Sequence, residues 1–200
     1  MAPSAERYVS AQNGVVRLAV RDLRVLWSRL SRLDPLSKRQ ALEQFWPVLI
    51  GRYGEITASL AADRFEELTG LSPVMVRPVD DERANARMRW AMGAAFEGAP
   101  EKSLALLEGL ADELVKQPGR STLIASAAGH GLRFARVPVG VTCPWCRLLG
   151  SRGFVYESRA SAGERRAFHG DCDCRIAIEG EPTPGYDPDA LYAEYQATRT

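Results

Sequence analysis

The stretch RFARVPVGVTCPWCRLLG, residues 133–150, decides the fold. Its first half alternates β-branched or aromatic residues with others, and this period of two is typical of a short strand. Its second half begins with Cys-Pro-Trp-Cys, after which we expect a single turn of helix. Two more segments of strand character follow at 153–158 and 174–180. The sequence therefore predicts a small α+β module with three short strands after residue 131.

All four cysteines of the chain lie between residues 143 and 174. The two-residue gap of the first pair lets both sulfurs of a tight turn face one point. In the second group, a one-residue gap places two thiols on the same face of an extended strand. Thiolate and imidazole ligands select zinc, which needs four donors in a structural site. We predict one structural Zn²⁺ ion, held by four of five candidates: Cys143, Cys146, His169, Cys172 and Cys174.

Other uses of the cysteines compete with structural zinc. A thioredoxin-like pair at Cys143 and Cys146 would not need a second pair of cysteines. Two disulfides would require that the mature protein end up outside the cell. A catalytic zinc would keep an open position beside an acid or base, but Asp171 and Asp173 are better explained as residues that solvate a turn. A zinc deaminase is excluded, because neither histidine is followed two residues later by glutamate.

Upstream of the cysteines, apolar residues recur at helical spacing. Asp34 is placed to cap a helix whose first turn contains Pro35. Pro47 predicts a kink or a break near 43–47, because it removes a backbone hydrogen bond. Nothing in 1–119 suggests catalysis. The predicted helices cover 7–33, 36–69, 83–96, a segment from Pro100, and a separate fifth segment from Pro118 to Gly129.

The expected fold is a mainly α N-terminal helical region followed by a small α+β zinc-binding module. We assign 1–119 to the helical domain, 120–180 to the metal-binding module, and 181–200 to a linker and short C-terminal helix. The linker EPTPGYDP contains three prolines and a glycine, so it predicts an extended tether. The acidic helix from about Asp187 is expected to be a docking element outside the core.

The composition limits the classes of partner that the chain is expected to bind. The formal net charge is +1, so the whole chain lacks the basic excess that drives strong binding to nucleic acid. Residues 120–180 nevertheless carry nine arginines against five acidic residues. No apolar run approaches the length of about eighteen residues that would suggest a membrane span. With no signal peptide in view, we expect a chain made and folded in a reducing cytoplasm, with no membrane partner.

The segments 133–158 and FHGDCDCRIAI, residues 168–178, together resemble the C-terminal module of the MuF-like minor capsid proteins of tailed bacteriophages. In that family a strand leads into C-x-x-C, then a loop and strand, then an H-x-x-C-x-C element. The upstream segments MRWAMGAAF (88–96) and GRSTLIASAAGHGLRFARVP (119–138) resemble the actinobacteriophage branch. The resemblance therefore covers most of 80–180.

This resemblance implies a head-morphogenesis protein that acts with the portal. The implied location is the virion, in the capsid interior or the portal region, after synthesis in the host cytoplasm. The implied partners are the portal, the scaffold or the major capsid protein, with weak contact to packaged DNA kept open. The family supplies no catalytic residue, so no enzyme is expected. The alternative is a small zinc-dependent nucleic-acid-binding protein, based on the arginine-rich stretch 133–175.

Overall fold

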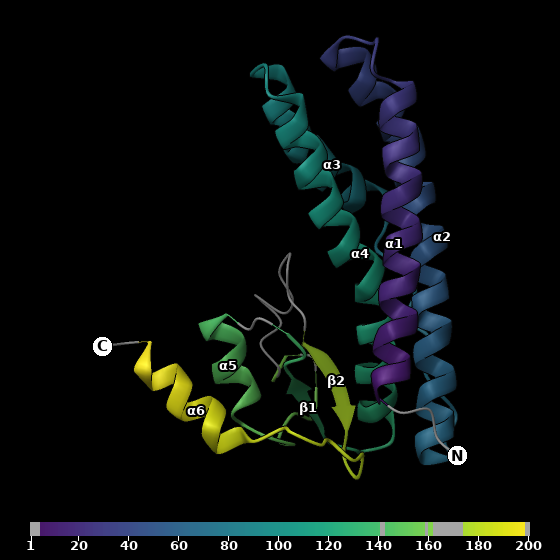
Figure 1. Cartoon of the computed structure of the whole chain (residues 1–200). Helices are drawn as coiled ribbons and strands as arrows, with labels where there is room; N and C mark the ends of the chain where they lie inside the picture. Colours follow the sequence, from purple (N-terminus) through teal and green to yellow (C-terminus); the bar gives the residue numbers. More distant parts are fainter. Residues whose placement is uncertain (1–4, 141–142, 159, 162–173, 199–200) are drawn as a thin grey trace.

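The computed structural model describes residues 5–140, 143–158, 160–161 and 174–198. Over these residues the chain is mainly helical, as predicted, with one small two-stranded sheet. Four long helices run side by side, and the sheet and two short helices gather at one end of them (Figure 1). The elements are α1 (Ala5–Arg29), α2 (Pro35–Thr69), α3 (Asp81–Phe96), α4 (Pro100–Gly129), β1 (Phe134–Val137), α5 (Pro144–Gly150), β2 (Arg175–Ile178) and α6 (Pro188–Ala197).

Local sequence signals set the helix ends. The Asp34 side chain accepts hydrogen bonds from the backbone N–H groups of Leu36 and Ser37, so α2 begins with the predicted cap. Gly70 ends the same helix with a φ of 70°, a left-handed conformation that glycine adopts without steric cost. Asp80 likewise caps α3. The cap predicted at Asp34 is confirmed, because it depends on residues close together in the chain.

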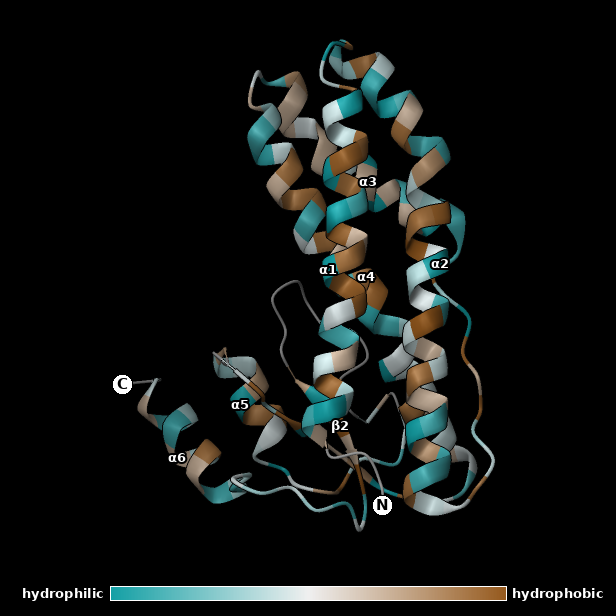
Figure 2. Cartoon of the chain, turned by 45° about the vertical axis from the view of Figure 1, so that its right-hand side comes forward, coloured by the Kyte–Doolittle hydropathy of each residue, from teal (hydrophilic) through white to brown (hydrophobic). Residues whose placement is uncertain are grey.

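Two apolar clusters hold the long helices together, and α3 contributes to the first of them only. The upper cluster joins all four long helices. Its buried residues include Leu23 of α1, Trp46 of α2, Met88 of α3 and Leu107 of α4. Hydropathic colouring shows brown apolar bands running along the long helices (Figure 2). The lower cluster joins the helices to the small sheet and α5, so the α+β end shares a core with the bundle. Its buried members are Tyr8, Ala61, Phe65, Leu123, Ile124, Ala127, Phe134, Cys146, Tyr156, Cys174, Ile176 and Ile178.

Both interior prolines lie within continuous helices. Of the kink or break expected near 43–47, the break is absent: α2 continues through Pro47, and the buried side chains of Trp46 and Ile50 hold it in the upper cluster on either side. The separate fifth helix expected from Pro118 is also wrong, since α4 continues to Gly129 and runs across the expected domain boundary at 119 and 120.

A contact from α2 supports α4 in the turn before Pro118. The Thr57 hydroxyl donates a 2.5 Å hydrogen bond to the carbonyl of Val115, in the turn before Pro118. The carbonyl that Pro118 leaves without its helical donor is that of Leu114, so the Thr57 bond does not replace the missing donor but ties α2 to the same turn.

The sheet is smaller than predicted. β1 and β2 pair antiparallel, with Phe134 opposite Ile178 and Val137 opposite Arg175. The third strand expected at 153–158 is wrong: only Tyr156 pairs there, through an isolated bridge to Phe134. Gly153, with a φ of 70°, turns the chain just before this point, so a longer ladder does not form.

The crossing of α2 and α4 requires glycine at position 119. A Cβ added to Gly119 would lie 2.7 Å from the backbone oxygen of Thr57. We therefore expect Gly119→Ala to lower the free energy of unfolding by about 1–3 kcal/mol, through overpacking against backbone. Gly109 of the same helix is the matched control, because its Cβ would meet nothing within 4 Å. Gly109→Ala should instead raise stability by about 0.5–1 kcal/mol, through helix propensity. Urea denaturation measures the free energy of unfolding of both variants. Equal effects at the two sites would contradict the close approach of α2 to α4 at Gly119.

Candidate metal centre

The C-x-x-C motif forms the first turn of α5. Cys143 caps the helix in an extended conformation, and its sulfur accepts a 3.4 Å hydrogen bond from the backbone N–H of Cys146. Pro144 occupies the first helical position, where no donor is needed. The predicted helical turn is confirmed, and it extends to Gly150. Both cysteines thus belong to one rigid turn, with Cys143 half-buried and Cys146 buried.

The third described cysteine comes from a different segment. Cys174 directly precedes β2 and is 3% exposed. It belongs to the lower apolar cluster together with Cys146, and Cys143 packs against the same cluster. Antiparallel pairing of β1 with β2 brings this segment beside the chain that leads into α5. The structure therefore gathers three of the five predicted ligands, which lie up to 31 positions apart, in one cluster.

The other two candidates, His169 and Cys172, lie outside the described residues. Within the described part, no three His, Cys, Asp or Glu side chains are arranged to hold a metal ion. The donor chemistry of Cys143, Cys146 and Cys174 nevertheless suits zinc, since all three offer sulfur. A complete tetrahedral set would take its fourth donor from the segment that contains His169 and Cys172.

Arg136 is a second feature of this site. It lies on β1, is fully buried, and its guanidinium donates a 3.8 Å hydrogen bond to the sulfur of Cys146. Donors to sulfur stabilise the negative charge of metal-bound thiolates. Sequence reasoning missed Arg136, because an arginine in an alternating strand is normally expected to face solvent. Every residue of β1 and β2 is buried, so alternation could not separate two faces here.

Two tyrosines anchor the end of α5. The hydroxyl of Tyr156 donates a 2.6 Å hydrogen bond to the carbonyl of Leu149, and the hydroxyl of Tyr186 donates to the carbonyl of Gly150. Burial raises the pKa of Tyr186 to about 12 and also raises that of Tyr156. Both hydroxyls therefore stay protonated at neutral pH and serve as donors. They fix the C-terminal end of the helix whose first turn holds the cysteines.

The C-terminal tail packs back on its own chain. The predicted short helix is confirmed as α6, capped by Asp187. The side chain of Leu191 lies against Gly150 of α5, and Glu194 pairs with Arg147 at 3.3 Å.

The expectation that the chain beyond Gly180 lies outside the core is wrong at Glu181. This carboxylate is buried between Arg64 and Arg175, a pairing that a linker-like sequence does not reveal.

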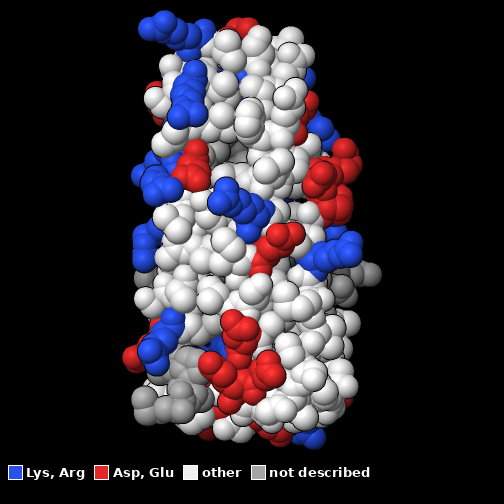
Figure 3. All heavy atoms as spheres, turned by 90° about the vertical axis from the view of Figure 1, so that its right-hand side faces the viewer, with Lys and Arg blue, Asp and Glu red and all other residues white. Residues whose placement is uncertain are grey.

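The arginines after residue 119 that the structure describes do not form a uniform basic surface. Among the described ones, Arg120, Arg136 and Arg175 are buried. Arg147 is ion-paired as described above, and Arg133 lies 3.8 Å from Glu157. The face of the molecule in Figure 3 likewise shows basic and acidic side chains interspersed, with uncharged surface between them. Such a mixture lacks the single-sign field that steers nucleic acid to a protein.

Comparison with known families gives one match. The model of a family described as VG15 protein matches residues 1–198. The match includes both the long helices and the cysteine-containing end. Neither a curated protein nor a solved structure matches the chain. In the described residues, no helix combines the length and apolarity needed to cross a membrane.

Proposed function

The chain belongs to the VG15 protein family, and on this premise we propose that it is a minor capsid protein that acts in phage head morphogenesis with the portal. The family is viral, which indicates a phage protein. The observation that carries the finer proposal is the clustering of Cys143, Cys146 and Cys174. The MuF-like pattern needs its C-x-x-C and C-x-C elements to meet, and these cysteines come from both.

We further propose that the cluster holds one structural zinc ion. Four of the five candidates, Cys143, Cys146, His169, Cys172 and Cys174, would bind it. The ion would cross-link the start of α5 to the start of β2 without needing an open coordination position. Arg136 would stabilise the thiolate charge through its contact with Cys146. The role of this chain in the proposal is structural and not enzymatic.

The proposed partners are the portal, the scaffold or the major capsid protein, and the proposed location is the capsid interior or the portal region. The long helices α1–α4 supply an extended rigid surface for such contacts. The alternative of a nucleic-acid-binding protein is less favoured. Of the five described arginines in 133–175, four are buried or paired with a carboxylate: Arg133, Arg136, Arg147 and Arg175. Of that alternative, the proposal keeps only a weak contact between the chain and packaged DNA, which added salt would disrupt.

Particles made with and without this gene product test the proposed function. We expect mass spectrometry of purified virions or procapsids to find the chain in few copies per particle. A nonsense mutation in its gene should lower the yield of filled, infectious heads, and expression of the chain in trans should restore it. The Gly109→Ala chain is a matched complementation control, because it alters no contact within 4 Å. Absence from both particles, together with an unchanged yield of heads, would refute the proposal.

A further inference from the structure

An apolar groove of about 290 Å³ lies between α1 and α2 on the helical body. Its floor is formed by the partly buried side chains of Leu26 and Leu49. Three apolar side chains beside them are open to solvent: Val25 is 46% exposed, Phe45 is 53% and Val48 is 66%. Single exposed apolar residues are ordinary, but several around one concavity mark an interaction surface.

The rim of this groove is positively charged. Arg29 and Arg52 line it, and neither has an ion-pair partner among the described residues. The acid beside them, Asp22, is already engaged: it accepts a 2.5 Å hydrogen bond from Tyr53 and pairs with Arg21. These two hydrogen bonds, that from Tyr53 first, lower the pKa of Asp22. An occupant with apolar and acidic side chains would therefore complement the groove.

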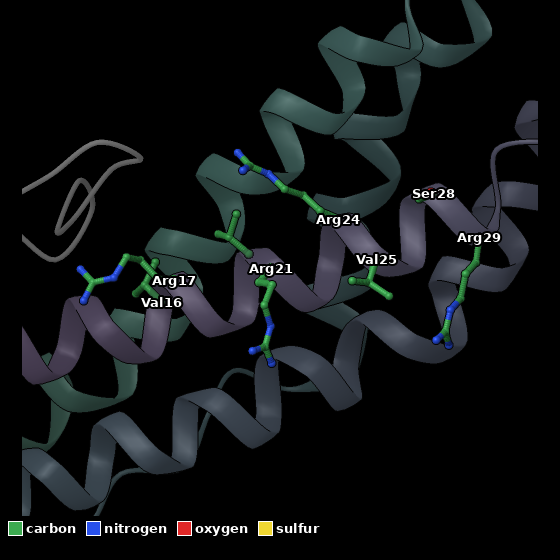
Figure 4. A pocket seen from close by; sticks show the side chains of 8 residues that line it. Val16, Arg17, Arg21, Arg24, Val25, Ser28 and Arg29 are labelled. Carbon is green, nitrogen blue, oxygen red and sulfur yellow. The ribbon is translucent and has the colours of Figure 1, made fainter.

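The basic surface continues along α1. A neighbouring pocket of about 790 Å³ shares Val25 and Arg29 with the groove. Figure 4 shows Arg21 and Arg29 on the α2 side of α1, whereas Arg24 lies on the α4 side. Arg24 is neutralised there by Glu108, with 2.6 Å between the two side chains. Arg21 pairs with Asp22, so of these three arginines Arg29 alone has no ion-pair partner among the described residues, and it lies on the side that faces the groove.

The outer face of α6 has the complementary chemistry. No residue of α6 is buried, and Tyr192 is 48% exposed, with its ring stacked 6.5 Å from that of Tyr195. Asp189 is exposed in the first turn, and Glu194 keeps more than half of its side chain in solvent despite its pairing. The helix thus presents the exposed ring of Tyr192 beside the carboxylate of Asp189, whereas Glu194 lies toward α5, where it pairs with Arg147.

The α6 helix cannot reach the groove of its own chain. It is held against α5 at the small-sheet end and projects away from α1 and α2 (Figure 1). We propose that α6 of one copy docks into the α1–α2 groove of a second copy. Tyr192 would lie among Val25, Phe45 and Val48, with Asp189, three residues away on the same side of the helix, facing the rim arginines Arg29 and Arg52.

Such pairing is head-to-tail, because it joins two different surfaces of the chain, so copies form a closed ring or an open row. A ten-residue helix covers less than a standard interface, and we expect weak association with a Kd on the order of 0.1 mM. A partner that gathers several copies would raise their effective concentration. This inference is independent of the proposed function.

Sedimentation velocity tests the pairing with the whole chain. From about 10 µM to about 1 mM, a range that brackets the expected Kd, the weight-average sedimentation coefficient should rise. Arg29→Glu with Arg52→Glu should weaken the association about tenfold, because rim attraction becomes repulsion. Arg77→Glu with Arg83→Glu is the matched control: it makes the same charge change at exposed positions outside the groove.

A charge swap excludes a mere folding defect. Asp189→Lys alone should also weaken association. When this variant is mixed with the Arg29→Glu, Arg52→Glu protein, association between the two should return, because the unmodified α6 of the rim variant meets the unmodified groove of the Asp189→Lys chain, and the introduced lysine meets the introduced glutamates. A sedimentation coefficient that does not change with concentration overturns the proposal. So does a control variant that weakens association as strongly as the rim variant, or a mixture that fails to associate.

Discussion

Replacing Cys146 with serine is expected to abolish zinc binding and to unfold the cysteine-containing end of the chain. Structural zinc in small modules supplies on the order of 10 kcal/mol of apparent binding free energy at neutral pH, and a serine hydroxyl does not replace a thiolate ligand. Cys146 is also 2% exposed, so the substitution places an additional polar group in the lower apolar cluster. The reduced wild-type chain should contain about one zinc per molecule by metal analysis.

The shared core determines how far this unfolding spreads. Cys146 and Cys174 lie in the same cluster as Tyr8, Phe65 and Leu123 of the long helices. We therefore expect the lower ends of those helices to loosen with the metal. The upper cluster contains no residue beyond Val115, so far-UV circular dichroism should retain most of the helical signal.

The control for this experiment is Ala105→Ser, at an exposed position of α4, which should keep both zinc content and melting temperature. Zinc-free wild-type protein with intact thiols, or a Cys146→Ser chain that melts like the wild type, would remove the metal proposal.

The parts of the fold that sequence predicts are those governed by neighbouring residues. Asp34 and Gly70 mark the two ends of α2 through hydrogen bonds to residues at most four positions away. The identity of these two residues is therefore enough to locate both ends. Pro118 fails as a helix start because tertiary contacts hold α4 at this point, such as the hydrogen bond that Thr57, 58 positions away, donates to the carbonyl of Val115. A prediction from neighbouring residues includes the cost of the proline, but it does not include that contact.

The same distinction holds at the candidate site. The spacing of Cys143 and Cys146 predicts one turn, and the structure has it. Arg136 and Glu181 escaped prediction because charged residues are buried only when a distant segment supplies a partner. Glu181 meets Arg64, 117 positions away, on a helix that periodicity alone describes as amphipathic.

Removal of the Glu181 carboxylate is expected to have the second-largest effect. Its oxygens accept hydrogen bonds from Arg64, from Arg175 at 2.5 Å, and from the backbone N–H of Ile178 at 3.1 Å. Arg64 is 2% exposed and lies over the ring of Tyr8, 5.1 Å from its centre. Burial lowers the pKa of Arg64, and the charge of Glu181 acts in the opposite direction. Without the carboxylate, two buried guanidinium groups would lose this shared acid.

Glu181→Ala should therefore lower the free energy of unfolding by about 3–5 kcal/mol, the usual cost of removing one partner from a buried ion pair. Glu179→Ala is the matched control: Glu179 is exposed, and its loss should cost less than about 0.5 kcal/mol. Truncation separates the carboxylate from the rest of the tail. A chain that ends at Tyr186 keeps both Glu181 and the Tyr186 anchor, and it should melt well above the same shortened chain with Glu181→Ala, because only the second leaves Arg64 and Arg175 without the carboxylate. Equal melting temperatures for the two truncated chains would show that this carboxylate does not hold the tail segment to α2.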